Sequence, residues 1–269
     1  MSTPSQIIAA DGTTLAFHAT PAGADTAGPG IVFLGGFMSD MTGDKATTLE
    51  AWAQRTGRGY LRLDYSGHGA SGGAFRDGTV GRWTTDALTV IEHVGRHVAG
   101  FDGPLVLVGS SMGGWIMVRV ALALQRAATR QHAAGLVGIA AAADFTHDVM
   151  PARLGPEIVA HIAEHGYFEA PSEYSDEPYI ITRAMIEDGN RQRVLKAPLE
   201  LEMPVRLIHG TADADVPWTQ SQKLMEALTS DDVELILVKD GDHRLSSARD
   251  LARLVAVIER LLAQIIASR

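Results

Sequence analysis

The chain has no cysteine among its 269 residues. Disulfides, thiolate metal ligands and a cysteine nucleophile are therefore excluded. Basic residues are also scarce, because 23 Lys and Arg stand against 32 Asp and Glu, giving a net charge of -9. Since binding to nucleic acid phosphates needs a basic face, this balance argues against a nucleic acid partner.

Long apolar runs are missing as well. No uninterrupted run of about 18 apolar residues is present, although a membrane-spanning helix would need one. The first residues, Met1–Gln6, are polar and do not show the basic and then apolar pattern of a secretory signal. These absences lead us to expect a cytoplasmic protein with no membrane span.

The residues that are present suffice for one large α/β domain. Hydrophobic residues make up 46% of the chain, enough for a sizeable core. Apolar runs alternate with segments of helical spacing, which indicates a mostly parallel central sheet covered by helices on both faces. The predicted strands are Gln6–Ala10, Thr14–Thr20, Ile31–Leu34, Tyr60–Tyr65, Pro104–Val108, Gly135–Ala141, Val205–Ile208 and Val233–Val238. The predicted helices are, approximately, Thr47–Thr56, Trp83–Val98, Trp115–Leu124 and Ser246–Ala267.

This regular pattern breaks between Asp144 and Pro204. The stretch contains several prolines, including Pro171, and short amphipathic pieces such as Pro156–His165. We therefore expect a core made of residues 1–143 and 205–269, with residues 144–204 inserted as a helical lid over the site. The alternative is an ordinary helical excursion that does not touch substrate.

A tight turn between a predicted strand and a predicted helix carries the main catalytic signal. Gly109, Ser111 and Gly113 fit the pattern G-x-S-x-G, in which a serine stands exposed at a strained strand-to-helix turn. Ser111 is therefore the candidate nucleophile. The Met112 N–H, at the start of the helix, is a candidate oxyanion donor. The alternative is a Gly-rich turn that only packs tightly.

A serine nucleophile needs a base and an acid, expected later in the chain in the order acid and then base. His243 is the candidate base, because it alone follows a late strand by a short Gly-containing loop. Asp213, just past the end of another strand, is the candidate acid, with Asp215 second and Asp144 third. His209 should lie in or beside the strand and is expected to be structural.

The loop after Ile31–Leu34 should supply a second oxyanion donor. Gly35 and Gly36 let the backbone turn inward, so the Phe37 N–H is the candidate, although the glycines alone would also fit a simple turn. The Gly-rich segment Asp64–Gly72 is expected to support this loop. Apolar residues near predicted loop ends favour an acyl or aromatic group in the pocket, and the candidate substrate-binding residues are Met38, Met150 and Trp218.

These motifs resemble the α/β-hydrolase superfamily across nearly the whole chain. The stretches Gly35–Ala46, Asp64–Gly67, Val108–Trp115 and Asp242–Arg244 are similar to the abhydrolase-domain family that includes a mitochondrial palmitoyl-protein thioesterase, also described as an acyl-glucuronide esterase. The resemblance implies hydrolysis of acyl esters or thioesters, of small molecules or of acylated proteins, with no cofactor. It assigns the triad to the same three residues. Because no transit-like segment stands at the N-terminus, a cytoplasmic relative of bacterial type is expected.

Other functions remain open at this point. A small-molecule carboxylesterase or a C–C bond hydrolase would use the same fold and triad. His161 and His165 fit the zinc-peptidase pattern H-x-x-E-H, but no third ligand is evident, so no metal site is predicted. A non-catalytic receptor of the same fold is the last alternative, and it would normally have a broken triad.

Overall fold

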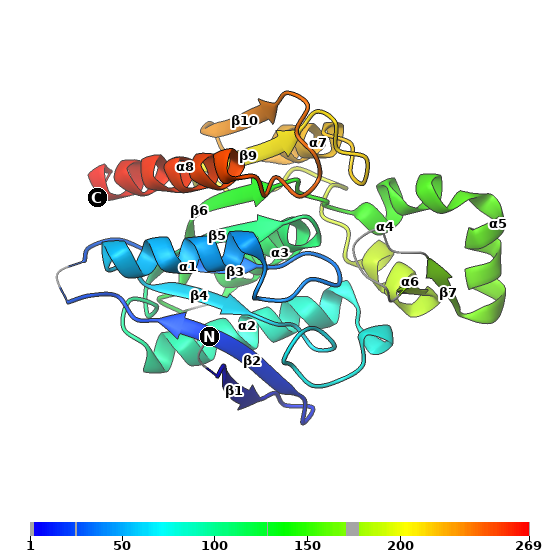
Figure 1. The fold of residues 1–269 in the computed structure, drawn as a ribbon, viewed down its shortest axis with the longest axis horizontal. Helices are drawn as coiled ribbons and strands as arrows, with labels where there is room; N and C mark the ends of the chain where they lie inside the picture. Colours follow the sequence, from blue (N-terminus) through cyan, green and yellow to red (C-terminus); the bar gives the residue numbers. More distant parts are fainter. Residues whose placement is uncertain (1–2, 25, 128, 171–177, 269) are drawn as a thin grey trace.

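The computed structural model describes residues 3–24, 26–127, 129–170 and 178–268 (Figure 1). Within these ranges the core is an eight-stranded sheet in the order β1-β2-β4-β3-β5-β6-β9-β10. Strands β1 and β2 run antiparallel to their neighbours, and the pairings from β4 to β10 are parallel. The strands are β1 Ser5–Ile8, β2 Thr14–Thr20, β3 Gly30–Leu34, β4 Tyr60–Leu63, β5 Pro104–Ser110, β6 His132–Ile139, β9 Val205–Gly210 and β10 Val233–Val238.

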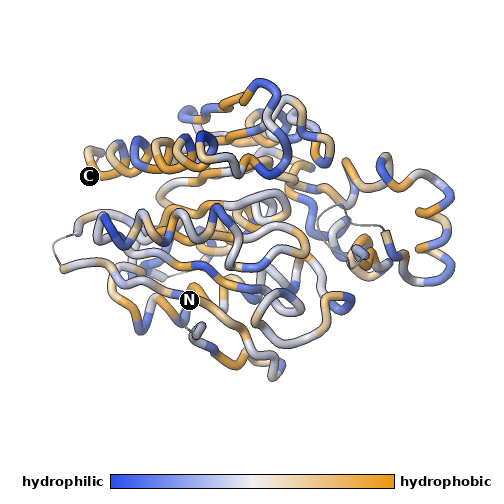
Figure 2. Tube along the Cα trace, in the orientation of Figure 1, coloured by the Kyte–Doolittle hydropathy of each residue, from blue (hydrophilic) through white to orange (hydrophobic). Residues whose placement is uncertain are grey.

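Helices cover both faces of this sheet. Helices α1 (Asp44–Thr56) and α8 (Ala248–Ala267) pack on one face, and α2 (Val80–His97), α3 (Met112–Arg126) and α7 (Thr219–Ala227) pack on the other. Apolar and polar segments follow one another along each turn of α8 (Figure 2). Its buried side chains recur three or four positions apart, which places them on one face of the helix. The mostly parallel, doubly covered sheet agrees with the prediction.

Three helices, α1, α2 and α3, begin three residues before their predicted starts, and caps explain the first two. The start of α1 is Asp44 instead of Thr47, because Gly43 has the extended backbone of an N-cap and Asp44 places a negative charge in the first turn. The start of α2 is Val80 instead of Trp83, because the Thr79 side chain accepts a hydrogen bond from the Arg82 N–H. Apolar periodicity alone does not detect such caps.

The irregular stretch forms an insertion between β6 and β9. It comprises α4 (Phe145–Asp148), α5 (Met150–His165), an antiparallel hairpin of β7 (Tyr167–Ala170) and β8 (Tyr179–Thr182), and α6 (Arg183–Arg191). The hairpin corrects the expectation of a purely helical insertion. Pro171, which that expectation included, lies outside the described residues. Figure 1 shows the insertion beyond the carboxyl ends of the parallel strands.

The buried side chain of Asp144 ties the two ends of the insertion together. Its carboxylate accepts hydrogen bonds from the N–H groups of Val194 (2.7 Å) and Leu195 (2.9 Å), where the chain returns to the core. The carboxylate of Asp144, the third candidate for the catalytic acid, is thus engaged at the base of the insertion, whereas His243 Nδ1 faces Asp213. None of the described helices is both long and apolar enough to cross a bilayer.

Candidate active site

Ser111 stands between the end of β5 and the start of α3. Its backbone has φ 54° and ψ -120°, a strained combination for a residue with a side chain. Backbone hydrogen bonds hold it there: its N–H donates to Ile139 (2.9 Å), and its carbonyl accepts from Gly114 (2.8 Å) and Ala142 (3.0 Å). The turn therefore presents the Ser111 side chain at the carboxyl edge of the sheet.

Glycines allow the strand and helix on either side of this turn to approach closely. A Cβ added at Gly109 would lie 2.3 Å from the Gly113 carbonyl oxygen. One added at Gly113 would lie 2.1 Å from the Leu34 carbonyl oxygen. Because both obstacles are backbone atoms, neither side chain can be accommodated by a change of rotamer.

We expect Gly113→Ala to destabilise the fold by about 3 kcal/mol, the upper end of the usual cost of overpacking. In a domain of this size such a loss lowers the melting temperature by roughly 6–12 °C. Thermal unfolding followed by circular dichroism measures the shift. The matched control is Gly103→Ala, because a Cβ at Gly103 meets nothing within 4 Å. Equal melting temperatures for the two variants would show that the close approach is relaxed.

The structure brings Ser111, His243 and Asp213 together. His243 Nε2 lies 3.0 Å from Ser111 Oγ, and His243 Nδ1 lies 2.8 Å from Asp213 Oδ2. An ionised carboxylate can only accept a hydrogen bond, so Nδ1 carries the proton and donates a hydrogen bond to Asp213. Nε2 is then free to accept the Ser111 hydroxyl proton, which is the tautomer that a general base needs.

Hydrogen bonds surround the fully buried Asp213 carboxylate. Its Oδ1 accepts from the N–H groups of Asp215 (2.9 Å) and Val216 (2.8 Å), and its Oδ2 faces His243 and His209. Burial alone would raise the pKa of this carboxyl group. The hydrogen bonds from both histidines, together with that from Val216, outweigh burial and lower the pKa well below its ordinary value. Asp213 therefore stays ionised and can hold the His243 ring.

The sequence did not indicate the contact between His209 and Asp213. His209 is fully buried, with its Nε2 3.0 Å from both Asp213 Oδ2 and the Val216 carbonyl oxygen. Because both neighbours of Nε2 are acceptors, Nε2 carries the ring proton. Nδ1 is then unprotonated and accepts a hydrogen bond from the Ser221 hydroxyl at 2.7 Å. His209 is thus satisfied, as expected, and it also orients the acid. Its position at the end of β9 was the only available signal.

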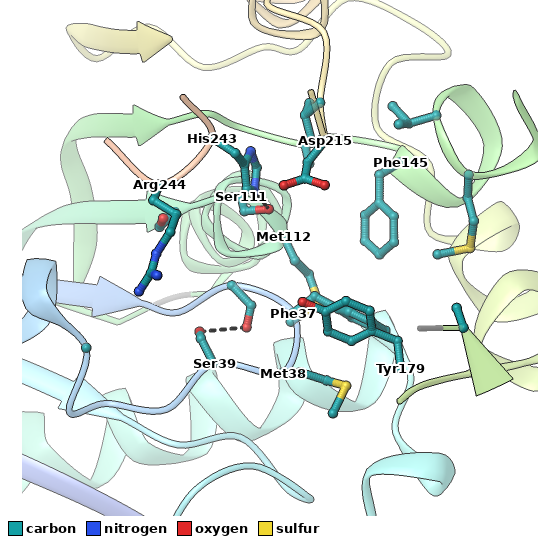
Figure 3. Close-up of a pocket in the computed structure, with 18 of the residues that line it drawn as sticks. Phe37, Met38, Ser39, Ser111, Met112, Phe145, Tyr179, Asp215, His243 and Arg244 are labelled. Carbon is teal, nitrogen blue, oxygen red and sulfur yellow. Dashed lines mark hydrogen bonds between the residues drawn. The ribbon is translucent and has the colours of Figure 1, made fainter. Parts of the chain in front are cut away.

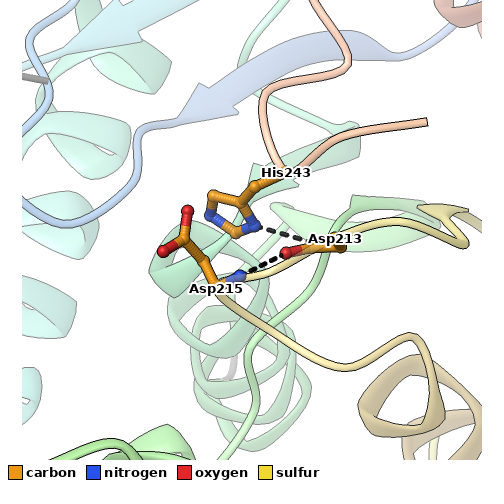
Figure 4. A group of neighbouring side chains, drawn as sticks. All are labelled: Asp213, Asp215 and His243. Atoms are coloured by element: carbon orange, nitrogen blue, oxygen red, sulfur yellow. Dashed lines mark hydrogen bonds and ion pairs between the residues drawn. The ribbon is translucent and has the colours of Figure 1, made fainter. Parts of the chain in front are cut away.

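Asp215, the second candidate acid, forms an ion pair with the insertion. Its carboxylate pairs with Arg153 of α5 at 2.6 Å, although Figure 4 shows it beside His243. A metal ion needs a cluster of His, Cys, Asp or Glu side chains. Within the described part of the chain, one group of three such side chains has its potential ligand atoms within 4.8 Å of one another, namely Asp213, Asp215 and His243. The hydrogen bonds within this group and the ion pair of Asp215 with Arg153 explain why these side chains lie close together, so their proximity does not require a metal ion.

The two histidines of the zinc-peptidase pattern stack on α5 with ring centroids 4.2 Å apart. No third His, Asp or Glu joins His161 and His165 among the residues that the structure describes. The geometry therefore gives the zinc-peptidase alternative no support.

The candidate oxyanion donors come from two segments that meet at Ser111. Met112 opens α3, where helical N–H groups have no intrahelical acceptor. The Gly36 carbonyl accepts from the N–H (3.3 Å) and Oγ (2.9 Å) of Ser39, so the Phe37 N–H of the same trans peptide points away from Ser39. A Cβ on Gly36 would lie 3.3 Å from Ser111 Cβ, which shows how closely the two segments approach.

A cavity of about 770 Å³ opens over these residues (Figure 3). One side is apolar and comes mainly from the insertion, with Phe145, Val149, Met150, Leu154, Ile158, Phe168, Ala170, Tyr179 and Ile181. The opposite side is polar and includes Ser39, Asp40, Thr42, Asp44, Lys45, Arg244 and Ser246.

Two of the three candidate substrate-binding residues line this cavity. They are Met38 and Met150. Trp218 is absent from the described lining, which corrects that prediction. The buried Val216 does line the cavity, whereas Trp218 occupies the position directly before α7, where its side chain makes no capping hydrogen bond.

Comparisons with known proteins place this geometry in context. Residues 31–184 match the family model described as serine aminopeptidase, S33. The chain is 37% identical to the palmitoyl-protein thioesterase ABHD10, mitochondrial, of Mus musculus over 235 residues, 87% of this chain and 75% of that protein.

Solved structures are similar over almost the full length. A putative hydrolase from Agrobacterium vitis S4 has a TM-score of 0.87 and 45% identity, covering 97% of each chain. The mouse alpha/beta hydrolase domain-containing protein 10 has a TM-score of 0.84 and 33% identity, covering 98% of this chain and all of that one. These similarities confirm the predicted fold class. They contradict the cytoplasmic prediction, because the curated relatives are named as mitochondrial.

Proposed function

Because the chain belongs to the α/β-hydrolase family described as serine aminopeptidase, S33, we propose that it cleaves carboxylic ester or thioester bonds of acyl substrates through a serine nucleophile. The observation that carries the proposal is the hydrogen-bonded series from Ser111 Oγ through His243 to Asp213 at the cavity floor. Esterases and acyl-protein thioesterases both use this chemistry.

The reaction proceeds in two steps. Ser111 attacks the acyl carbonyl carbon while His243 Nε2 takes the hydroxyl proton, and Asp213 stabilises the imidazolium that forms. The negative charge that develops on the carbonyl oxygen is held by the Met112 and Phe37 N–H groups, each worth about 3–4 kcal/mol in oxyanion holes. His243 then protonates the leaving alcohol or thiol and activates the water that releases the acid.

Within this proposal, residues 144–204 act as a lid over a core of residues 1–143 and 205–269. Apolar side chains of the insertion form much of the cavity wall. Arg153 of α5 also joins the loop of the candidate acid through Asp215. The acyl chain therefore lies under the insertion, and the polar side of the cavity receives the leaving group.

The relatives named palmitoyl-protein thioesterase favour a long acyl group. The cavity volume of about 770 Å³ lies within the range of small-molecule sites, roughly 300–1,000 Å³. Each buried methylene is worth about 0.8 kcal/mol. We therefore expect kcat/KM to rise by roughly threefold to fourfold per methylene from the acetyl ester upward, until the apolar wall ends.

Matched oxyester and thioester series from acetyl to palmitoyl measure this trend, with the Ser111→Ala variant as the blank. A long-chain optimum with a preference for thioesters would support a depalmitoylating role. An acetyl optimum with equal use of both bonds would contradict that role and leave a small-molecule esterase. A wild-type rate no higher than the blank would refute the proposal.

A further inference from the structure

The segment Ser39–Ala46 links the candidate oxyanion loop to α1 along one side of the cavity. Its sequence, S-D-M-T-G-D-K-A, lies within the stretch Gly35–Ala46 that resembles the abhydrolase-domain family, and the proposed mechanism does not use its lysine. Ser39 shapes the oxyanion loop through the Gly36 carbonyl. The Met41 N–H is fixed by Asp64 Oδ1 at 2.7 Å. The segment is thus anchored at its start, and Lys45 extends from its far end.

Lys45 reaches across the cavity rim to the loop that carries His243. Its half-buried Nζ donates to the backbone carbonyl of Arg244, the residue directly after His243. A second, longer contact joins Nζ to Ser246 Oγ at 3.4 Å. One lysine on α1 therefore contacts two residues on the C-terminal side of His243, although about 200 positions separate them in the sequence.

Two hydrogen bonds to the Asp213 loop hold the N-terminal side of this loop. The Asp240 N–H donates to Thr211 Oγ1 at 2.8 Å, and the Gly241 carbonyl accepts from the Ala212 N–H at 3.0 Å. Both contacts attach the loop to the segment of Asp213. They precede His243 in the chain.

After His243 the loop passes through an unfavourable conformation. Leu245 has φ 44°, in the left-handed region that residues with a side chain seldom adopt. Its burial favours that state, and its N–H donates to Asp242 Oδ1 at 2.8 Å within the same loop. The peptide that joins Arg244 to Leu245 carries the carbonyl that Lys45 holds, so the lysine fixes the bond next to the strained residue.

We propose that Lys45 is a positioning residue for His243, acting through the Arg244 carbonyl so that Nε2 stays within reach of Ser111 Oγ. The inference rests on the proposed function, because it assigns His243 as the base. Lys45 contributes no atom to the reaction. Its loss lets the loop relax at Leu245, which misaligns the base and slows proton transfer.

Charged groups around Lys45 give this role a pH signature. Burial and the Arg244 cation lower the pKa of Lys45 to about 8, while Asp44, Asp242 and Asp250 oppose that change. Above this pH the ammonium becomes a neutral amine, which donates a weaker hydrogen bond to the carbonyl. We expect the wild-type kcat to decline in part as the pH rises through about 8. Lys45→Met should lack this decline.

The test compares Lys45→Met with Lys239→Met on a short neutral ester. Lys239 lies exposed in the same loop, so the control removes the same charge by the same substitution. We expect Lys45→Met to lower kcat per active serine by about tenfold with KM within about twofold, and Lys239→Met to stay near wild type. Titration with a fluorophosphonate counts active serines, which removes any effect of unfolded protein. Lys45→Arg, which keeps the charge and donors, should recover at least about a third of the rate.

Equal kcat values for the two methionine variants would overturn the inference. So would a loss confined to KM, because that result would make Lys45 a substrate contact. A Lys45→Met profile that still declines through pH 8 would contradict the pH assignment. Failure of the proposed function is distinguishable, since wild type would then hydrolyse no ester faster than Ser111→Ala.

Discussion

Replacing Ser111 with alanine is expected to lower kcat on acyl esters by about 10⁶-fold, the loss seen when a triad nucleophile is removed. Ser111 Oγ lies 3.0 Å from His243 Nε2, so the base can take the hydroxyl proton directly. The measurement is kcat per folded protein. Ser110→Ala is the matched control, since it removes the neighbouring hydroxyl from the same turn, and its kcat should stay within about tenfold of wild type.

His243→Ala should cost as much as Ser111→Ala, and the double variant should be no slower than either single one. Nucleophile and base act as a unit, so the second loss removes nothing that remains in use. A double variant that is slower than both singles would indicate that one of the two residues acts independently. That outcome would contradict the assigned roles.

Asp213→Ala is expected to lower kcat by about 10⁴-fold, whereas Asp215→Ala should lower it by less than about tenfold. Without Asp213, His243 Nδ1 loses the acceptor that fixes its tautomer, and His209 Nε2 loses one of two acceptors. Asp215 is the matched control because it is an aspartate of the same loop whose carboxylate pairs with Arg153 of the insertion.

The two variants also distinguish the effect of losing the catalytic acid from the effect of losing the ion pair between Asp215 and Arg153. Asp215→Ala should change KM for long acyl substrates more than kcat, because it frees Arg153 at the cavity rim. If Asp215→Ala were the more damaging change to kcat, the assignment of Asp213 as the acid would be wrong.

Much of the core could be predicted from the sequence because central parallel strands are buried on both faces. Their apolar runs, such as Ile31–Leu34 in β3, are therefore continuous and easily recognised. Strands β2 and β10 match their predicted bounds fully. Helix starts were less accurate, since they depend on caps such as Gly43 and Thr79 that lie outside the apolar pattern.

The residues of the candidate site were predictable because parallel strands place their following loops at one edge of the sheet. Chain order and strand ends therefore indicated Ser111 and His243 and ranked Asp213 ahead of Asp215 and Asp144 as the acid. Contacts between distant segments left no such signal. The bond from His209 to Asp213 and the bridge from Lys45 to the His243 loop depend on how loops from different strands meet in space.

The insertion was the hardest part to predict. Its many prolines suggested irregular structure, yet Tyr167–Ala170 and Tyr179–Thr182 pair as strands. Each strand is only four residues long, too short for a clear alternation of apolar and polar residues. Trp218 was misplaced for a related reason, because its apolar character does not reveal that it lies directly before α7.

The most direct test of the account is the mass of the intact protein after reaction with a fluorophosphonate, followed by peptide mapping. The account predicts one adduct per chain, on Ser111, with labelling slowed strongly in His243→Ala because the nucleophile loses its base. Labelling at another residue would contradict it. Hydrolysis that a chelator abolishes, in a protein that the fluorophosphonate does not label, would contradict it as well and would point to a metal-dependent hydrolase.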